Sequence, residues 1–140
     1  MRILSALEIA NAVGGELFGN PQALVQGVCI DSRKSENGWM FAAIKGENVD
    51  GNIFAKAALS SGCSVAITNT YIECPENKAY IKVSDTVAAL QRLAEYNRNH
   101  FDIKLIGVTG SVGKTTTKEM VYKAVSAGFE THKTEGNFNN

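Results

Sequence analysis

Residues 107–117 have the sequence Gly-Val-Thr-Gly-Ser-Val-Gly-Lys-Thr-Thr-Thr. The run Ile-Lys-Leu-Ile at residues 103–106 predicts a strand before this stretch, and apolar residues at helical spacing in residues 118–127 predict a helix after it. A glycine turn between a strand and a helix presents backbone N–H groups and the positive end of the helix dipole to an anion. The stretch therefore predicts a phosphate-binding loop that begins an α/β unit.

The glycines, the lysine and the threonines of this loop have separate predicted roles. Gly110 and Gly113 allow the backbone to turn its N–H groups inward. Lys114 is long enough to reach the β and γ phosphates of a nucleotide, and the Thr115 hydroxyl is suited to binding Mg²⁺. We therefore predict Lys114 as the catalytic residue, Thr115 as the metal ligand, and a nucleotide-binding set made of Gly110, Ser111, Val112, Gly113, Lys114, Thr115 and Thr116.

The loop departs from the strict nucleotide-binding pattern at one position. That pattern has a glycine five positions before the Gly-Lys pair, where this chain has Val108. A plain glycine turn between a buried strand and a helix is the alternative interpretation. The Gly-Lys-Thr sequence in its expected strand–helix context favours nucleotide binding.

The composition favours a soluble, cytoplasmic protein. The 140 residues are 44% hydrophobic and 20% charged, as in ordinary globular domains. Fourteen basic residues balance fourteen acidic ones, so charge gives no reason to expect a nucleic-acid or membrane partner. No apolar run approaches the roughly 20 residues of a membrane span. Cys29, Cys63 and Cys74 are widely spaced and form no CxxC pair, which favours reduced thiols over a zinc site.

Segments before the loop alternate between helix and strand patterns. Ser5 and Glu8 form a capping box that predicts a helix to about Val13, ended by the glycines at positions 14 and 15. Strands are expected at residues 16–18, 25–30, 39–44, 64–68 and 79–83, and the run at 39–44 is continuously apolar, which predicts burial on both faces. Two further helices are expected. One is marked by Ile53, Phe54, Ala57 and Ala58 and ends near residue 62, and the other runs from Ser84 or Asp85 to about residue 100, with Val87, Leu90, Leu93, Ala94 and Asn97 on its inner face.

A domain boundary is predicted near residues 100–103. Residues 1–101 are expected to form an α/β domain, and residues 102–140 to begin a second one with a strand, the loop, a helix and a further strand at residues 130–133. A parallel nucleotide-binding sheet needs more strands and more covering helices than this second part supplies. We therefore expect the chain to be the N-terminal part of a longer enzyme.

Two motifs resemble those of the Mur ligases. Residues 109–115, Thr-Gly-Ser-Val-Gly-Lys-Thr, are similar to the family's phosphate loop T-G-x-x-G-K-[ST], a form that the folylpolyglutamate synthases share. Asp31-Ser32-Arg33, followed by Gly-Trp-Met-Phe-Ala-Ala-Ile-Lys-Gly-Glu at residues 38–47 and by Asp50-Gly51, resembles the domain that holds the UDP end of the muropeptide. Lys-Glu-Met at residues 118–120 and the ending at residues 133–140 favour the member that adds the terminal dipeptide.

The resemblance implies a fold and a reaction. Residues 1–101 are expected to form a mixed-sheet domain for the UDP-muropeptide, and residues 102–140 the first strand–loop–helix unit of a parallel-sheet ATP-binding domain. In the family reaction, ATP phosphorylates the terminal carboxylate of UDP-N-acetylmuramoyl-tripeptide, and the amine of D-alanyl-D-alanine attacks the acyl phosphate. Positive charge and Mg²⁺ at the γ-phosphate matter most for this step, because two anions meet. The fragment alone is expected to be inactive, and its full-length parent to be a monomer.

The resemblance also implies further site residues, each with a plainer alternative. Ser32 and Arg33 are expected to contact the uracil or diphosphate, although Arg33 could instead pair with Asp31 or Glu36 at the surface. Lys45 is expected to pair with the diphosphate, and its alternative is a solvated loop charge. The amides of Asn137 and Asn140 suit nucleotide or metal-water contacts, and their alternative is the capping of a turn.

Three other functions compete with this interpretation. The related ligase that adds the third peptide residue shares most of the motifs. A non-catalytic module that binds a UDP-sugar or a nucleotide would keep the fold with a vestigial loop. The intact Lys114 and Thr115 disfavour this for the full-length parent, though not for the fragment. A GTPase or kinase is disfavoured because the chain contains no Asn-Lys-x-Asp sequence for guanine.

Overall fold

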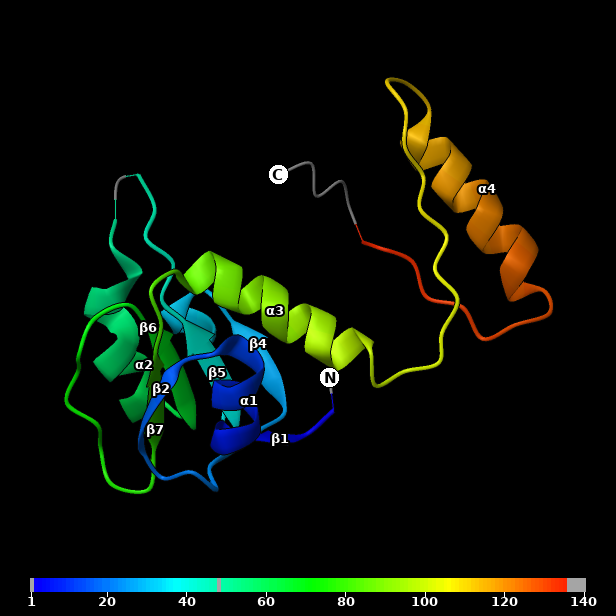
Figure 1. Ribbon diagram of the computed structural model, residues 1–140. Helices are drawn as coiled ribbons and strands as arrows, with labels where there is room; N and C mark the ends of the chain where they lie inside the picture. Colours follow the sequence, from blue (N-terminus) through cyan, green and yellow to red (C-terminus); the bar gives the residue numbers. More distant parts are fainter. Residues whose placement is uncertain (1, 48, 136–140) are drawn as a thin grey trace. The chain divides into compact units, whose positions relative to one another are not determined.

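The computed structural model describes residues 2–47 and 49–135. The chain divides into two compact units, Met1–Asp102 and Ile103–Asn140. Figure 1 shows the first unit as a sheet with helices packed on it and the second as a loop followed by one long helix. Each unit is described by itself below.

A five-stranded mixed sheet forms the centre of the first unit. Its strands are β2 (Glu16–Gly19), β4 (Gly27–Cys29), β5 (Trp39–Ala42), β6 (Val65–Thr68) and β7 (Ala79–Lys82), in the spatial order β2-β7-β6-β5-β4. The pairs β4–β5, β5–β6 and β6–β7 are parallel, whereas β2 is antiparallel to β7. The short strands β1 (Leu4–Ser5) and β3 (Leu24–Val25) pair antiparallel in a separate sheet. This arrangement confirms the predicted mixed α/β fold of the first unit.

Three helices cover the two faces of the sheet. Helix α1 (Ala6–Val13) and helix α3 (Thr86–Arg98) pack against one hydrophobic cluster, and helix α2 (Ala55–Ser60) packs against the other (Figure 1). Neighbouring residues of β5 separate between the clusters, because successive side chains of a strand point to opposite faces: Met40 belongs to the first and Phe41 to the second. The predicted burial of this strand on both faces is confirmed.

The helix ends of the first unit follow the predicted chemistry. The Ser5 hydroxyl accepts a hydrogen bond from the Glu8 N–H at 3.2 Å, and the Glu8 carboxylate accepts one from the Ser5 N–H at 2.8 Å. Gly14 ends α1 with a φ of 68°, in the left-handed region that favours glycine. Asp85 caps α3 by accepting hydrogen bonds from the N–H groups of Val87 and Ala88 at 2.8 and 3.0 Å.

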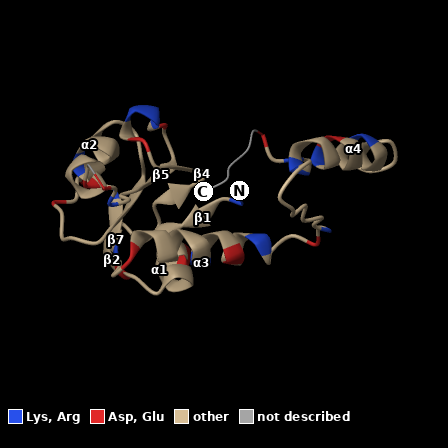
Figure 2. Ribbon diagram, turned by 90° about the horizontal axis from the view of Figure 1, so that it is seen from above, with Lys and Arg blue, Asp and Glu red and all other residues tan. Residues whose placement is uncertain are grey.

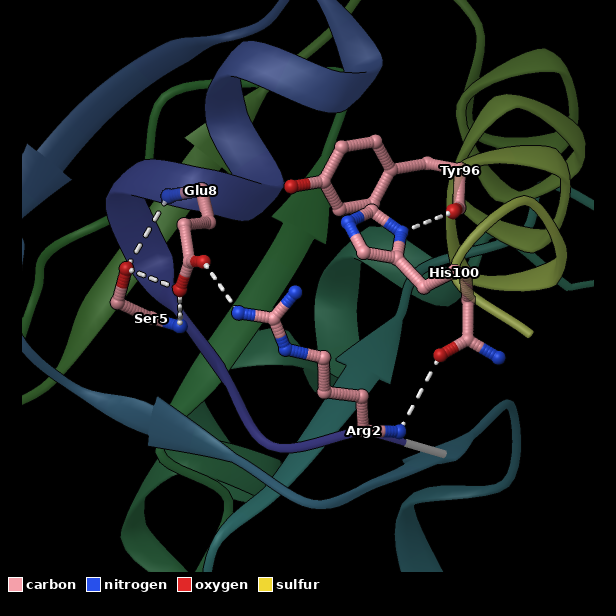
Figure 3. A network of polar contacts seen from close by, with 6 residues as sticks. Arg2, Ser5, Glu8, Tyr96 and His100 are labelled. Carbon is pink, nitrogen blue, oxygen red and sulfur yellow. Dashed lines mark hydrogen bonds and ion pairs between the residues drawn. The ribbon is translucent and has the colours of Figure 1, made fainter. Parts of the chain in front are cut away.

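A polar network joins the start of the chain to the end of α3 (Figure 3). Arg2 lies 3.7 Å from the Glu8 carboxylate, and its backbone N–H donates to the Asn97 side-chain oxygen at 3.2 Å. His100 Nδ1 donates to the Tyr96 carbonyl at 2.7 Å. These contacts hold α1 and α3 together outside the apolar cluster that they share.

Some predicted details of the first unit are wrong. The strand predicted at residues 25–30 is interrupted at Gln26. The piece before it, β3, pairs with β1, and the piece after it, β4, pairs with β5. The helix predicted from residue 53 begins as the 3-10 helix η2 (Gly51–Phe54), and Ile53 is 70% exposed. Helix α2 buries Ala55, Ala58 and Leu59, and leaves Ala57 exposed. Helix α3 exposes Val87 and Ala94 and buries Ala89 with Leu93, because it rests on its neighbours along a stripe shifted from the predicted one.

The second unit forms a helix without the predicted strands. Helix α4 (Lys114–Ser126) begins directly after the glycine loop, as predicted. Residues 103–106 are not a strand, and Leu105 and Ile106 are 71% and 63% exposed. Residues 130–133 are not a strand either. A strand needs a partner for its backbone hydrogen bonds, and no described segment of the second unit pairs with either run. The predicted strand–loop–helix unit is thus present only as loop and helix.

Candidate functional site

The glycine loop has the backbone geometry of an anion-binding turn. Gly110 and Gly113 have φ angles of 148° and 80°, both in the region that favours glycine. Gly113 is the N-cap of α4 and has no side chain with which to cap the first-turn N–H groups. Such a helix start attracts anions through its N–H groups and its dipole.

Lys114 folds back over this loop. Its ammonium donates to the Gly110 carbonyl at 2.7 Å, and the side chain is exposed. Val112 at the tip of the loop is 91% exposed, and Ser111, Thr115 and Thr116 are exposed as well. The structure therefore brings the predicted set from Gly110 to Thr116 together in one solvent-facing turn, with its positive charge beside the glycines. Contacts of these residues with a nucleotide stay a prediction.

Asn137 and Asn140, the two amides predicted to contact a nucleotide, lie outside the described residues.

The first unit has a hollow of about 230 Å³ at one edge of its sheet. It is lined by Lys45, Asn69, Ser84, Asp85, Thr86 and Val87. These residues follow the carboxyl ends of β5, β6 and β7, which is where ligands of open α/β sheets usually bind. The hydroxyl of Thr86 is buried and has no hydrogen-bond partner in the structure. The hollow thus combines a cation, several polar groups and the start of α3.

Lys45 reaches this hollow from a tight loop. A backbone bridge pairs Lys45 with Asp50, and the Gly46 N–H donates to the Val49 carbonyl at 2.9 Å. Asp50 in turn accepts hydrogen bonds from the backbone and side chain of Asn52, and these bonds, helped by the Lys45 charge, lower the pKa of the Asp50 carboxyl. Pairing between backbone groups of the loop therefore holds the backbone of Lys45 in place.

Arg33 makes the ion pair that was its alternative role. It lies in the 3-10 helix η1 (Ser32–Lys34), and its guanidinium donates to both Asp31 carboxylate oxygens at 2.9 and 2.8 Å. The side-chain hydrogen bonds from Arg33, followed by its backbone N–H, lower the pKa of Asp31 to about 2. Neither Ser32 nor Arg33 lines the hollow that Lys45 reaches. Their contact with a uracil or diphosphate stays a prediction.

The sequence interpretation missed Asn69, Ser84 and Thr86. Each is a polar residue just after a predicted strand, and carboxyl ends of parallel strands meet at one edge of a sheet. That signal was present in the sequence and identifies the hollow once the parallel pairing is recognised.

No acidic cluster suited to holding a metal alone occurs in the described part of the chain. All three cysteines are free, as predicted, and the sulfurs of Cys29 and Cys63 lie 3.9 Å apart in the core. Among residues 2–47 and 49–135, no helix is long and apolar enough to cross a bilayer.

Comparison with known proteins identifies the family. The family described as "Mur ligase family, catalytic domain" matches residues 24–98, more than half of the chain. The chain belongs to the Mur ligase family. A second description, "Mur ligase middle domain", matches residues 108–140, which begin with the glycine loop. This Mur ligase chain therefore matches one family domain before the glycine loop and a second one that includes the loop.

Individual Mur ligases resemble the chain over most of its length. It is 42% identical over 136 residues to the UDP-N-acetylmuramoyl-tripeptide–D-alanyl-D-alanine ligase of Bacillus subtilis, covering 94% of this chain and 30% of that one. A crystal structure of MurF from Acinetobacter baumannii has a TM-score of 0.89 at 36% identity, over 100% of this chain and 31% of that one. MurF from Thermotoga maritima, solved with ADP, has a TM-score of 0.74 at 32% identity, over 82% of this chain and 26% of that one. The chain thus spans less than a third of each of these relatives.

Proposed function

We propose that the chain is the N-terminal part of an ATP-dependent ligase that joins D-alanyl-D-alanine to UDP-N-acetylmuramoyl-tripeptide through an acyl phosphate. The observation that carries this proposal is the glycine turn at the start of α4, with the Lys114 ammonium over it, in a chain of the Mur ligase family. The 42% identity to a ligase of that name supports the choice of substrates. We further propose that the parent enzyme acts as a monomer in the cytoplasm.

The second unit supplies the nucleotide-binding step. When ATP binds, the N–H groups of residues 110–116 surround the phosphates, and the Lys114 ammonium exchanges the Gly110 carbonyl for phosphate oxygens. This positive charge offsets the repulsion between the triphosphate and the attacking carboxylate. The role fits an ammonium that is exposed and lies 2.7 Å from its own loop.

Mg²⁺ fits this site with few protein ligands. The Thr115 hydroxyl is an oxygen donor at the start of α4, and the described residues offer no group of three acidic or imidazole ligands. Magnesium prefers oxygen and often keeps most of its ligands as phosphates and waters, with one or two from the protein. The bound ion would polarise the γ-phosphate, while Thr115 would hold its position.

The first unit binds the UDP end of the peptide substrate. The hollow at the carboxyl ends of β5–β7 offers Lys45 to the diphosphate, and the polar groups of Asn69, Ser84 and Thr86 to the uridine or phosphate oxygens. Ser32 and Arg33 contribute contacts from η1. Arg33 brings a guanidinium that Asp31 already orients in a two-oxygen pair.

The Lys114→Ala variant tests the nucleotide-binding step. Removing the ammonium deletes one charge-assisted contact, so affinity for a fluorescent ADP with Mg²⁺ is expected to fall by about tenfold or more. Lys123→Ala on the same helix is the matched control and is expected to leave affinity within about twofold. Equal affinity of the chain and its Lys114→Ala variant would refute the nucleotide role.

Turnover tests the fragment's place in the reaction. The chain alone is expected to release no ADP from ATP when the UDP-tripeptide and D-alanyl-D-alanine are supplied, because it spans less than a third of its relatives. Robust ADP release coupled to peptide formation would show that the whole reaction needs no further domain, against the proposal.

A further inference from the structure

The chain after α4 turns back and runs along the helix. The N–H groups of Gly128 and Phe129 both donate to the Val125 carbonyl, at 3.1 and 3.0 Å, which ends α4 and reverses the chain. Residues 130–135, here called the return segment, then follow. The Lys133 ammonium forms an ion pair with Glu119 and lies 4.6 Å from the centre of the Tyr122 ring. One residue later, the Thr134 carbonyl accepts a hydrogen bond from the Lys118 ammonium at 2.8 Å.

These contacts give the return segment a direction. As the segment advances from residue 133 to residue 134, its partners on α4 move back from Tyr122 and Glu119 to Lys118. The segment therefore runs antiparallel to α4 and approaches the glycine loop. Lys118 lies one helical turn after Lys114. The contact between Lys118 and Thr134 is therefore one turn from the lysine that is predicted to bind the phosphates.

The contacts are partly shielded from water. The side chains of Lys118, Lys133 and Glu119 are 19%, 34% and 39% exposed, whereas most of α4 is exposed. The hydrogen bond from the Lys133 ammonium is the main reason that the pKa of the Glu119 carboxyl is lowered. Lys118 lies 3.8 Å from the same carboxylate, so Glu119 is bracketed by two ammonium groups (Figure 2 shows basic and acidic positions along α4). One carboxylate thus connects the helix to the segment that returns along it.

We propose that Glu119 and Lys133, aided by Lys118 and Tyr122, are positioning residues for the nucleotide site. They form a clamp that holds the return segment against the second and third turns of α4 and so fixes the helix start that carries Lys114. None of them contacts the phosphates; they act through the orientation of the loop N–H groups and of Lys114. This role rests on the proposed nucleotide function, and its ligand is a nucleoside di- or triphosphate with Mg²⁺.

Charge reversal at both ends of the clamp tests the proposal. In the complete chain, Glu119→Lys and Lys133→Glu are each expected to weaken binding of a fluorescent ADP with Mg²⁺ by about fivefold to tenfold, since each leaves like charges facing each other. The double variant restores the pair in reverse and is expected to return affinity to within about threefold. Glu130→Lys, in the same segment with the same charge change, is the matched control and should leave binding unchanged.

A second readout needs no nucleotide. Amide resonances of residues 110–117 are expected to shift in both single variants and to return in the double variant, while circular dichroism shows that α4 is kept. Loss of binding on Lys114→Ala with no effect of the single reversals would overturn the clamp and leave the nucleotide function standing. Equal binding of the chain and Lys114→Ala would overturn the nucleotide function, and unshifted loop amides would then overturn the clamp as well.

Discussion

The sequence predicts two alternative roles for Arg33 and does not separate them. The guanidinium of Arg33 pairs with Asp31 in the structure, and its contact with a diphosphate stays a prediction. Side-chain exposure differs across the pair, at 87% for Arg33 and 31% for Asp31. The carboxylate is therefore the more buried partner, and the guanidinium is the end that faces solvent.

The Arg33→Ala variant is expected to raise the pKa of Asp31 from about 2 toward its ordinary value of 3.8. The rise should be incomplete, because the backbone N–H at position 33 still donates to the carboxylate. A depressed pKa stabilises the folded state above the unfolded pKa, and this contribution disappears as the pH falls toward 2. In the variant that loss is smaller and is complete at a higher pH, because the pKa of Asp31 in the folded state is higher. Carbon-detected NMR titration of Asp31 gives the measurement.

Lys34→Ala is the matched control for this titration. Lys34 acts on Asp31 only through its charge and ranks behind every contribution of Arg33. It should therefore move the Asp31 pKa less than Arg33→Ala does. Equal shifts from the two variants would mean that general positive charge, and not the two-oxygen pair, holds the carboxyl ionised.

At the scale of elements, Ile81 and Ile53 are the same residue type in two very different surroundings. Ile81 in β7 is fully buried in the cluster under α1 and α3, while Ile53 in η2 is 70% exposed. Ile81→Ala is expected to lower the free energy of unfolding of the first unit by about 2–5 kcal/mol. Ile53→Ala should change it by less than about 0.5 kcal/mol. Urea titration followed by the fluorescence of Trp39, the chain's one tryptophan, measures both.

A large effect of Ile53→Ala would mean that η2 is covered in solution by something that the described residues do not supply. The comparison of the two variants matters because the sequence pattern used Ile53 to mark the start of an α-helix. In the structure Ile53 lies in the 3-10 helix η2, whose side chains are rotated relative to those of an α-helix.

The elements that the sequence predicted well are those whose signals are local. The capping box at Ser5 and Glu8, the cap at Asp85 and the glycine turn before Lys114 each depend on residues within one turn of each other. Residues 103–106 have a strand pattern but form no strand, because a strand depends on a neighbour that the pattern does not contain. The hollow at Lys45 depends likewise on strand order, which brings residues 45, 69 and 84–87 together.

The same distinction holds for the candidate sites. The glycine turn at residues 110–116 was predictable from composition and spacing alone, because the loop is continuous in sequence, and its contacts with a nucleotide stay a prediction. The ion pair between Glu119 and Lys133 joins residues on either side of a reversal of the chain, and no sequence motif predicts it. Ion pairs between distant residues depend on the path of the backbone between them, which spacing does not determine.

At the scale of the whole chain, its two units bury apolar surface to very different extents. Strands β5, β6 and β7 are almost entirely buried, whereas α4 has no fully buried residue along its described length. Met120 is 68% exposed and Phe129 is 74% exposed. Apolar burial supplies most of the free energy that protects a segment from opening, so the units should differ in local stability.

Hydrogen exchange is therefore expected to distinguish the two units in a dilute solution of the chain. Amides of β5–β7 should exchange slowly, with protection close to the full unfolding free energy, while those of α4 should exchange through local opening that is orders of magnitude more frequent. Within α4, the turn that contains Lys118 and Glu119 should be the slowest, because the return segment covers it. Protection of α4 equal to that of β6, at concentrations where the chain is monomeric, would contradict this expectation. It would show that the contacts with residues 130–135 stabilise the second unit far more than their exposed surface implies.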